Sequence, residues 1–267
     1  MSLAGMQQMS AKQRAVVDGA AIEYITVGNG HPAIVLINGS GGPVEGWYKV
    51  FGPLAQQGTV LAYNRPGVGG SARPLVAQTG DVLVASLRGL LGQAGLEPPY
   101  VLVGHSFGGL IANLFARTFP AEVAGVVLLD ATAPEDVAAM AAHQNAAQRL
   151  LKRTLDRLFG RDPLAESEHA AQTVAQIRQA GPFPAVPLVV VTGGKPAMSW
   201  ATPAAALAAR ATHQRELVAL SPHGRQIIAA RSGHFPQFSE PELVVEAVRQ
   251  IVQTQAEMIH EGHEGHE

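Results

Sequence analysis

The sequence predicts an α/β fold in which a mostly parallel sheet is covered by helices on both faces. Continuous apolar runs at residues 33–37, 123–129 and 188–192 are typical of strands that are buried on both sides. Stretches with a helical spacing of apolar residues, such as residues 81–96, lie between these runs. Strands that alternate with helices in this way favour a parallel sheet over an antiparallel one.

The composition excludes several classes of protein. The chain of 267 residues is 47% hydrophobic and 15% charged, so it can bury a sizeable core. Its net charge of −2 gives no general attraction to nucleic acid or to an anionic membrane. The absence of cysteine excludes disulfides and thiolate metal sites. Without a signal peptide or an apolar run of membrane-spanning length, we expect a cytoplasmic protein, whose oligomeric state stays open.

Local signals place the first elements of the sheet. The pair Asp18-Gly19 between two short strand-like stretches is typical of a tight hairpin turn. After the strand at residues 33–37 we expect a helix over residues 44–56, with helical spacing of the apolar side chains Trp47, Val50, Phe51 and Leu54. A strand at residues 59–63 then precedes the helix at residues 81–96.

The later part of the chain predicts an insertion. Residues 133–186 contain no strand-like run and are too long for an ordinary connection, so we interpret them as a helical cap. Ordinary helices on the outer face are the alternative. In the last helix, Ser239 and Glu242 have the spacing of a capping box. The expected domains are an α/β core at residues 11–132 and 187–256, the cap at residues 133–186 and a disordered tail at residues 257–267.

A Gly-x-Ser-x-Gly run is the first chemical signal. The letters G-H-S-F-G at residues 104–108 follow an apolar stretch and precede a helical pattern, the context of a nucleophile elbow. Gly104 and Gly108 suit a turn so tight that a Cβ would collide with neighbouring backbone. Ser106 is therefore the candidate nucleophile. The alternative is that these glycines only end a strand.

A serine nucleophile needs a base, which is usually a histidine. Three histidines lie in the last ordered part of the chain, namely His213, His223 and His234. His213 falls within a polar helical stretch, and His223 lies in a Ser-Pro-His-Gly turn. Only His234 directly follows a buried strand, in a Gly-containing loop ahead of the last helix. We therefore predict His234 as the base.

Four motifs together resemble those of the α/β-hydrolase fold family, in its esterase- and lipase-like members with a serine nucleophile. They are L-I-N-G-S-G-G at residues 36–42, N-R-P-G-V-G-G-S at 64–71, G-H-S-F-G-G at 104–109 and S-G-H-F at 232–235. The resemblance covers residues 16–252 and implies a mostly parallel sheet of eight strands.

The same resemblance implies an oxyanion hole built from two backbone N–H groups. One belongs to Phe107, the residue after the nucleophile, and the other to Ser40 in the loop after the strand at residues 33–37. The sequence departs from the family pattern at Asn38, where a histidine is usual. Asn38 can still make structural hydrogen bonds.

The acid that orients the base has several candidates. Similar proteins often place it after the strand at residues 188–192, but no carboxylate follows that strand here. The only acid between that strand and the predicted base is Glu216, within an expected helix. Asp130 is the better candidate, because it ends the strand next to the elbow strand and some lipase-like members are similar in this respect. A structural role for Asp130 is the alternative, and Asp136 and Glu135 are the reserves.

These expectations lead to a functional hypothesis. The chain is expected to be a serine hydrolase that cleaves a small ester or similar acyl substrate through an acyl-enzyme on Ser106, without cofactor or metal. The side chains of Phe107, Trp47 and Phe235 indicate a partly apolar pocket. The absent acid after Thr192 favours a second hypothesis, a catalytically weak member of this fold that binds a small ligand. Hydrolysis of a carbon–carbon bond also stays open.

Overall fold

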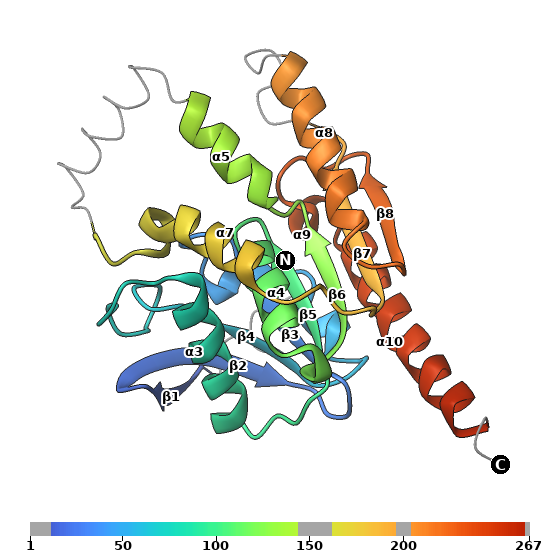
Figure 1. The fold of residues 1–267 in the computed structure, drawn as a ribbon. Coiled ribbons are helices and arrows are strands. Elements are labelled where there is room, and N and C mark those ends of the chain that lie inside the picture. Colours follow the sequence, from blue (N-terminus) through green and yellow to red (C-terminus); the bar gives the residue numbers. More distant parts are fainter. Residues whose placement is uncertain (1–11, 144–161, 196–203, 265–267) are drawn as a thin grey trace.

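A computed structural model describes residues 12–143, 162–195 and 204–264 of the chain. It contains an eight-stranded sheet with the strand order β1-β2-β4-β3-β5-β6-β7-β8 (Figure 1). The pairs β1·β2 and β2·β4 are antiparallel, and every later pair is parallel. The predicted fold, a mostly parallel eight-stranded sheet with helices on both faces, is confirmed. The strands are β1 Gln13–Val17, β2 Ala20–Val27, β3 Ala33–Ile37, β4 Val60–Tyr63, β5 Tyr100–His105, β6 Val123–Leu129, β7 Leu188–Gly193 and β8 Gly224–Ala229.

The hairpin between β1 and β2 is where the sequence predicted it. Asp18 and Gly19 both have positive φ, at 48° and 79°, as a two-residue type I′ turn requires. Val17 then pairs with Ala20 across the turn. The local Asp-Gly signal was therefore sufficient to place this turn.

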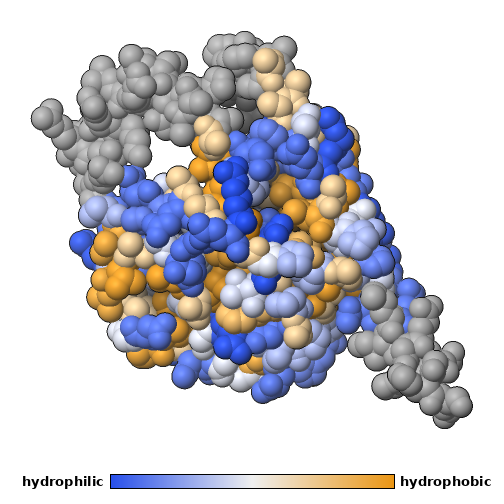
Figure 2. All heavy atoms as spheres, in the orientation of Figure 1, coloured by the Kyte–Doolittle hydropathy of each residue, from blue (hydrophilic) through white to orange (hydrophobic). Residues whose placement is uncertain are grey.

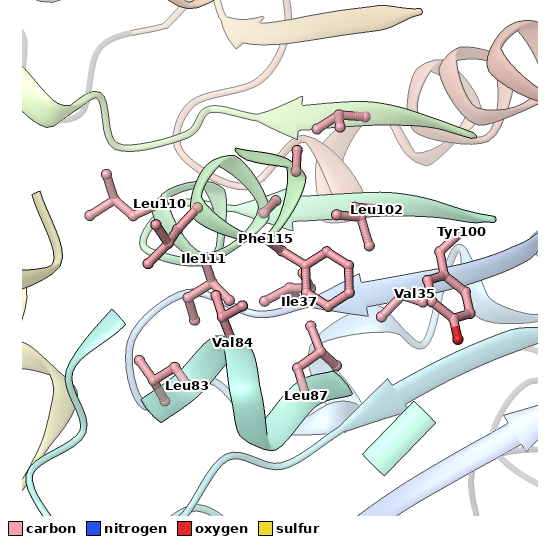
Figure 3. Close-up of a cluster of buried hydrophobic side chains, with 14 of the residues drawn as sticks. Val35, Ile37, Leu83, Val84, Leu87, Tyr100, Leu102, Leu110, Ile111 and Phe115 are labelled. Atoms are coloured by element: carbon pink, nitrogen blue, oxygen red, sulfur yellow. The ribbon is translucent and has the colours of Figure 1, made fainter. Parts of the chain in front are cut away.

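A large hydrophobic core lies between the sheet and the helices α3 (Gly80–Gln93), α4 (Gly108–Thr118) and α7 (Ala170–Gln179). Figure 3 shows Val35 and Ile37 of β3 pointing toward Leu87 of α3 and Phe115 of α4. Alternate strand residues point to opposite faces, so each buried strand supplies both sides of the sheet. This is why the strands read as continuous apolar runs.

The opposite face of the sheet has its own core. Ile34 and Leu36 of β3 point to this side, where they meet Val44 and Trp47 of η1 (Val44–Trp47) and the helix α2 (Phe51–Leu54). The long helix α10 (Pro241–Glu264) completes this layer and packs on β5, β6 and β7. The sheet is therefore the middle of three layers (Figure 1).

Two expectations about helices were wrong. The stretch at residues 44–56 is not one helix but the 3-10 turn η1 followed by the single turn α2. Pro53 has no N–H to donate to the carbonyl of Lys49, as a continuous helix would require. Ser239 does not cap the last helix, because it ends the short helix α9 (Pro236–Ser239) and donates to the carbonyl of Phe235.

Residues 133–186 contain the helix α5 (Pro134–His143), the 3-10 helix η3 (Glu166–His169) and α7, and no strand among the residues that the structure describes. The interpretation of this segment as a cap stays a prediction. At the C-terminus, α10 continues to Glu264, so residues 257–264 are helical where we expected a disordered tail. Glutamate, methionine and isoleucine in this stretch are compatible with a helix.

The helices α5 and α8 (Ala204–Val218) extend beyond the carboxyl ends of the central strands (Figure 1). A hydrogen bond between Asp136 and His213, with Oδ1 and Nδ1 2.6 Å apart, joins them. Hydrophilic and hydrophobic residues are interspersed over the face of the molecule seen in Figure 2.

None of the helices in the described ranges is both long and apolar enough to cross a membrane.

Candidate active site

Ser106 lies in the turn between β5 and α4, with a φ of 51°. Non-glycine residues rarely adopt this conformation, and it is found where the surrounding structure enforces it. A Cβ on Gly104 would lie 2.6 Å from the carbonyl oxygen of Gly108, and one on Gly108 would lie 2.2 Å from that of Ile37. The glycines therefore do more than end a strand, because they allow the elbow itself to form.

His234 lies in the loop between β8 and α9, beside Ser106. Its Nε2 is 3.0 Å from the Oγ of Ser106, within hydrogen-bond reach of the proton that a base would accept. The other two histidines are elsewhere. His213 contacts Asp136, and His223 lies exposed just before β8, at the opposite end of this strand from His234.

Asp130 follows β6 and completes a continuous chain of contacts. Its Oδ2 is 2.7 Å from the Nδ1 of His234. An ionised carboxylate only accepts hydrogen bonds, so the Nδ1 carries the hydrogen and the Nε2 is left to accept one from Ser106. The backbone N–H of Gly193 donates to the other carboxylate oxygen at 3.0 Å. The same side chain therefore makes both the histidine contact and a structural contact.

The charge state of Asp130 follows from its surroundings. The side chain is 5% exposed, and the Nη2 of Arg210 lies 2.6 Å from its Oδ2. Burial raises the pKa of this carboxyl, but the hydrogen bond from His234, the charge of Arg210 and the Gly193 amide outweigh it. The pKa of Asp130 therefore lies below its ordinary value, and the group is a carboxylate at neutral pH. No motif in the sequence marked Arg210.

The remaining candidate acids are engaged elsewhere or lie apart from the histidine. Asp136 accepts a hydrogen bond from the N–H of Ala133 and pairs with His213. Glu135 pairs with Arg178 at 3.7 Å. Glu216 is exposed on α8 and lines a hollow of about 330 Å³, whose other lining residues include members of α4, α5 and α7. None of these three has a contact with His234 among the described residues.

The two predicted oxyanion donors belong to segments next to Ser106. Phe107 directly precedes α4, and the loop leading to Ser40 passes close to Ser106, since a Cβ on Gly39 would lie 3.1 Å from the Cβ of Ser106. Within the described ranges, neither the N–H of Phe107 nor that of Ser40 has an intramolecular acceptor. Asn38 stabilises this loop by donating from Nδ2 to the carbonyl of Pro43 at 2.8 Å.

His105 contacts the backbone of the loop that contains His234. It is 3% exposed, and its Nε2 is 2.7 Å from the backbone carbonyl of His234, to which it donates. Burial lowers the pKa of His105 to about 4, so the ring is neutral at neutral pH. The sequence gives no signal for this contact beyond the position of His105 next to the nucleophile.

The three side chains that were predicted to form an apolar pocket lie in different environments. Phe235 is 48% exposed and packs against the rings of His105 and His234. Phe107 is buried in the core that contains α4. Trp47 is fully buried in the core on the opposite face of the sheet, so its predicted role in a pocket beside the nucleophile is wrong.

These features define a class of protein. Residues 34–247 match the family model described as "Alpha/beta hydrolase family", which is well over half of the chain. The chain belongs to the alpha/beta hydrolase family, as the four sequence motifs predicted.

Individual relatives are more distant. A stretch of 120 residues, 45% of this chain, is 34% identical to the dihydrolipoyllysine-residue acetyltransferase component of the acetoin cleaving system of Cupriavidus necator, and covers 32% of that protein. A stretch of 103 residues, 39% of this chain, is 32% identical to a soluble epoxide hydrolase of a Corynebacterium species and covers 35% of it. The chain thus matches about a third of the length of these curated relatives.

Solved structures share the fold along nearly the whole chain. A thermophilic esterase from Thermogutta terrifontis has a TM-score of 0.65 at 20% identity, over 92% of this chain and 99% of that one. The enol-lactonase from Burkholderia xenovorans has a TM-score of 0.63 at 20% identity, over 90% and 100% of the two chains. At this identity the likeness shows the fold alone.

Proposed function

We propose that this protein is a serine hydrolase that cleaves an ester or a similar acyl compound through an acyl-enzyme on Ser106. The observation that carries the proposal is the unbroken chain of contacts from Ser106 Oγ to His234, at 3.0 Å, and from His234 to Asp130, at 2.7 Å. These are the distances that a nucleophile, its base and an orienting acid require.

In the first half of the reaction, His234 Nε2 accepts the proton of Ser106 as the Oγ attacks the substrate carbonyl carbon. The carbonyl π electrons move to its oxygen, which the N–H groups of Ser40 and Phe107 stabilise. When the tetrahedral intermediate collapses, the bond to the leaving group breaks and His234 returns its proton to the leaving alcohol. The acyl group stays on Ser106.

In the second half, water takes the place of the alcohol. His234 removes a proton from the water, whose oxygen attacks the acyl carbon, and the collapse of this second intermediate releases the acid and returns the proton to Ser106. Asp130 stabilises the imidazolium that forms in both halves. The hydrogen bond from His234, the charge of Arg210 and the Gly193 amide keep the carboxylate ionised, so that it continues to orient the histidine.

A catalytically weak protein that binds a small ligand is the second hypothesis. The feature in its favour was the missing acid after Thr192. The contact between Asp130 and His234 weakens that argument, because a carboxylate at the end of β6 contacts the histidine although none follows β7. The hydrolase proposal is therefore the better supported of the two. As part of it, we propose that the inserted segment covers the substrate with its described residues 133–143 and 162–186, and that the substrate is small and partly apolar.

Covalent labelling tests this proposal. A fluorophosphonate probe, which reacts with activated serines, is expected to label the wild-type protein, and Ser106→Ala is expected to lose the label completely. The wild type is also expected to hydrolyse short-chain nitrophenyl esters, with at least a 1,000-fold loss in the variant, since removal of a triad serine typically costs on the order of 10⁶ in kcat. A folded wild-type protein that neither takes the label nor hydrolyses any of these esters would contradict the proposal and favour the ligand-binding hypothesis.

A further inference from the structure

A buried ion pair joins the inserted segment to the loop that contains Ser40. The Nε of Arg65 lies 2.5 Å from Oε2 of Glu166, and its Nη2 lies 2.8 Å from Oε1. The two side chains are 2% and 9% exposed. Glu166 begins η3, in the segment between β6 and β7, and is separated from Arg65 by 101 positions in the sequence.

Both partners of this ion pair also hold the backbone next to Ser40. Arg65 donates from Nη1 to the carbonyl of Asn38 at 2.9 Å and from Nη2 to that of Gly39 at 2.6 Å. The Oε1 of Glu166 accepts the N–H of Gly41 at 3.1 Å. The two peptide groups before Ser40 and the one after it are therefore each held by a charged side chain.

Stability alone is a weak explanation for this arrangement. Removing two charges from water costs several kcal/mol for each ion, and an apolar pair of similar volume is often at least as stabilising. Burial raises the pKa of Glu166, but the charge and hydrogen bonds of Arg65 outweigh it, so that the pKa is lowered and the carboxylate stays charged. The pair does supply directional contacts to three consecutive peptide groups, which apolar side chains do not.

We propose that Glu166 is a positioning residue, which acts through Arg65 and through the amide of Gly41 to aim the N–H of Ser40 at the substrate oxyanion. An oxyanion donor must lie within about 2.7–3.1 Å of the developing charge, so a small shift of this loop reduces its contribution. The inserted segment would then contribute to transition-state stabilisation as well as to substrate access. This inference rests on the proposed hydrolase function.

The test is the variant Glu166→Gln, which keeps the shape and a possible contact to Gly41 but removes the charge. Glu23→Gln is the matched control. Glu23 is also a buried carboxylate, 7% exposed, and accepts hydrogen bonds from Asn64 and Gly70, but it has no contact with the Ser40 loop among the described residues. Loss of one oxyanion donor typically reduces kcat by a factor on the order of 100, and a misaimed donor by less.

Three measurements separate positioning from general stabilisation. We expect Glu166→Gln to lower kcat about 10- to 100-fold with KM nearly unchanged. Its affinity for a trifluoromethyl ketone, which forms a tetrahedral oxyanion on the serine, should fall by the same factor. Its affinity for the alcohol product of the ester used, which has no acyl oxygen to bind the N–H of Ser40, should not change. Glu23→Gln should keep the wild-type kcat and trifluoromethyl ketone affinity at a temperature where both variants are folded.

A double variant keeps the inference falsifiable if Glu166→Gln fails to fold. Arg65→Met with Glu166→Met removes both charges together, so we expect stability to recover while kcat and ketone affinity stay low. Recovery of both kcat and ketone affinity would overturn the inference, as would wild-type values of both in folded Glu166→Gln. Failure of the hydrolase proposal gives a different result, because the wild-type protein itself would then be inert toward ester and fluorophosphonate.

Discussion

The carboxylate of Asp130 is held by groups from three separate segments. His234 comes from the loop after β8, the Gly193 amide from the end of β7, and Arg210 from α8. The backbone N–H of Asp130 also donates to the carbonyl of Val191 at 2.7 Å. These contacts stabilise an aspartate at a positive φ of 40°, which is uncommon outside glycine. A residue held in this way can orient a histidine with little loss of entropy when substrate binds.

Asp130→Asn tests the role of this residue. The asparagine amide can donate to Nδ1, which favours the histidine tautomer whose Nε2 carries the hydrogen and cannot accept the serine proton. We expect kcat for a nitrophenyl ester to fall roughly 1,000- to 10,000-fold, with the circular dichroism spectrum unchanged. Glu216→Gln is the control and should keep wild-type activity. Retained activity in folded Asp130→Asn, with a loss in Glu216→Gln, would contradict the assignment.

His105 makes a separate prediction about stability. Because burial lowers its folded-state pKa to about 4 from the ordinary value of 6.5, the unfolded chain binds a proton in this interval and the folded chain does not. The His105 contribution is therefore complete above about pH 6.5 and is lost as the pH falls toward 4, by up to about 1.4 kcal/mol per pH unit. His105→Gln, which can still donate to the carbonyl of His234, should show a shallower dependence in urea unfolding between these pH values. Equal slopes in the two proteins would refute the prediction.

The elements β5 and α4 meet at the elbow with little space between them and the neighbouring strand. The Cβ positions of Gly104, Gly108 and Gly109 would each lie under 3.0 Å from another atom. For Gly108 the nearest atoms are the backbone carbonyl oxygens of Ile37 and Asn38, at 2.2 and 2.6 Å, which belong to β3 and the loop toward Ser40. The turn that contains Ser106 and the loop that contains Ser40 are therefore brought together by close approach of their backbones, which leaves no room for a side chain on Gly108.

Gly108→Ala is expected to separate these two backbones. An inserted methyl group that must displace backbone costs about 1–3 kcal/mol or more, and the shift of the Ser40 loop should reduce kcat as well. Urea unfolding and ester hydrolysis measure the two effects. Gly92→Ala, in the exposed part of α3 with no atom within 4 Å of its Cβ, is the control and should be neutral or slightly stabilising. An equal effect of both substitutions would argue against the close contact.

At the scale of the whole molecule, two cores on opposite faces of one sheet stabilise the fold. The core on the α10 side includes η1 and α2 as well as α10, which packs on β5, β6 and β7. Ile251 of α10 is fully buried, and a Cβ on Gly125 of β6 would lie 2.4 Å from its Cγ2. The C-terminal helix is therefore part of the core that supports the central strands.

Ile251→Ala should measure the contribution of this layer. Truncation of a fully buried isoleucine typically costs about 2–5 kcal/mol, because the cavity collapses only in part. Ile228→Ala on β8 is the matched control, since Ile228 is 55% exposed, and it should cost less than about 1 kcal/mol. The free energy of unfolding in urea distinguishes them. A loss no larger for Ile251 than for Ile228 would contradict the proposed importance of α10.

Features that depend on a few neighbouring residues were predictable from the sequence by itself. The Asp18-Gly19 turn, the glycines around Ser106 and the apolar strands each satisfy a local backbone or burial requirement, so they identify the hairpin, the elbow and the sheet. His234 could be ranked above the other histidines because it follows the carboxyl end of a strand, at the same edge of the sheet as Ser106. Dependence on local signals also explains the wrong prediction of one helix over residues 44–56. The prediction followed the spacing of the apolar residues and did not take account of the break that Pro53 introduces.

Only the tertiary structure decided which acid contacts the histidine and what holds the Ser40 loop. Asp130 and His234 are 104 positions apart in the sequence, and Arg65 and Glu166 are 101 apart. Asp130, Asp136 and Glu135 follow the same strand and have similar chemistry, so composition and spacing could rank them but not choose between them. The choice depends on directions and distances at hydrogen-bond scale between segments from different elements, which exist only once the sheet and helices have packed.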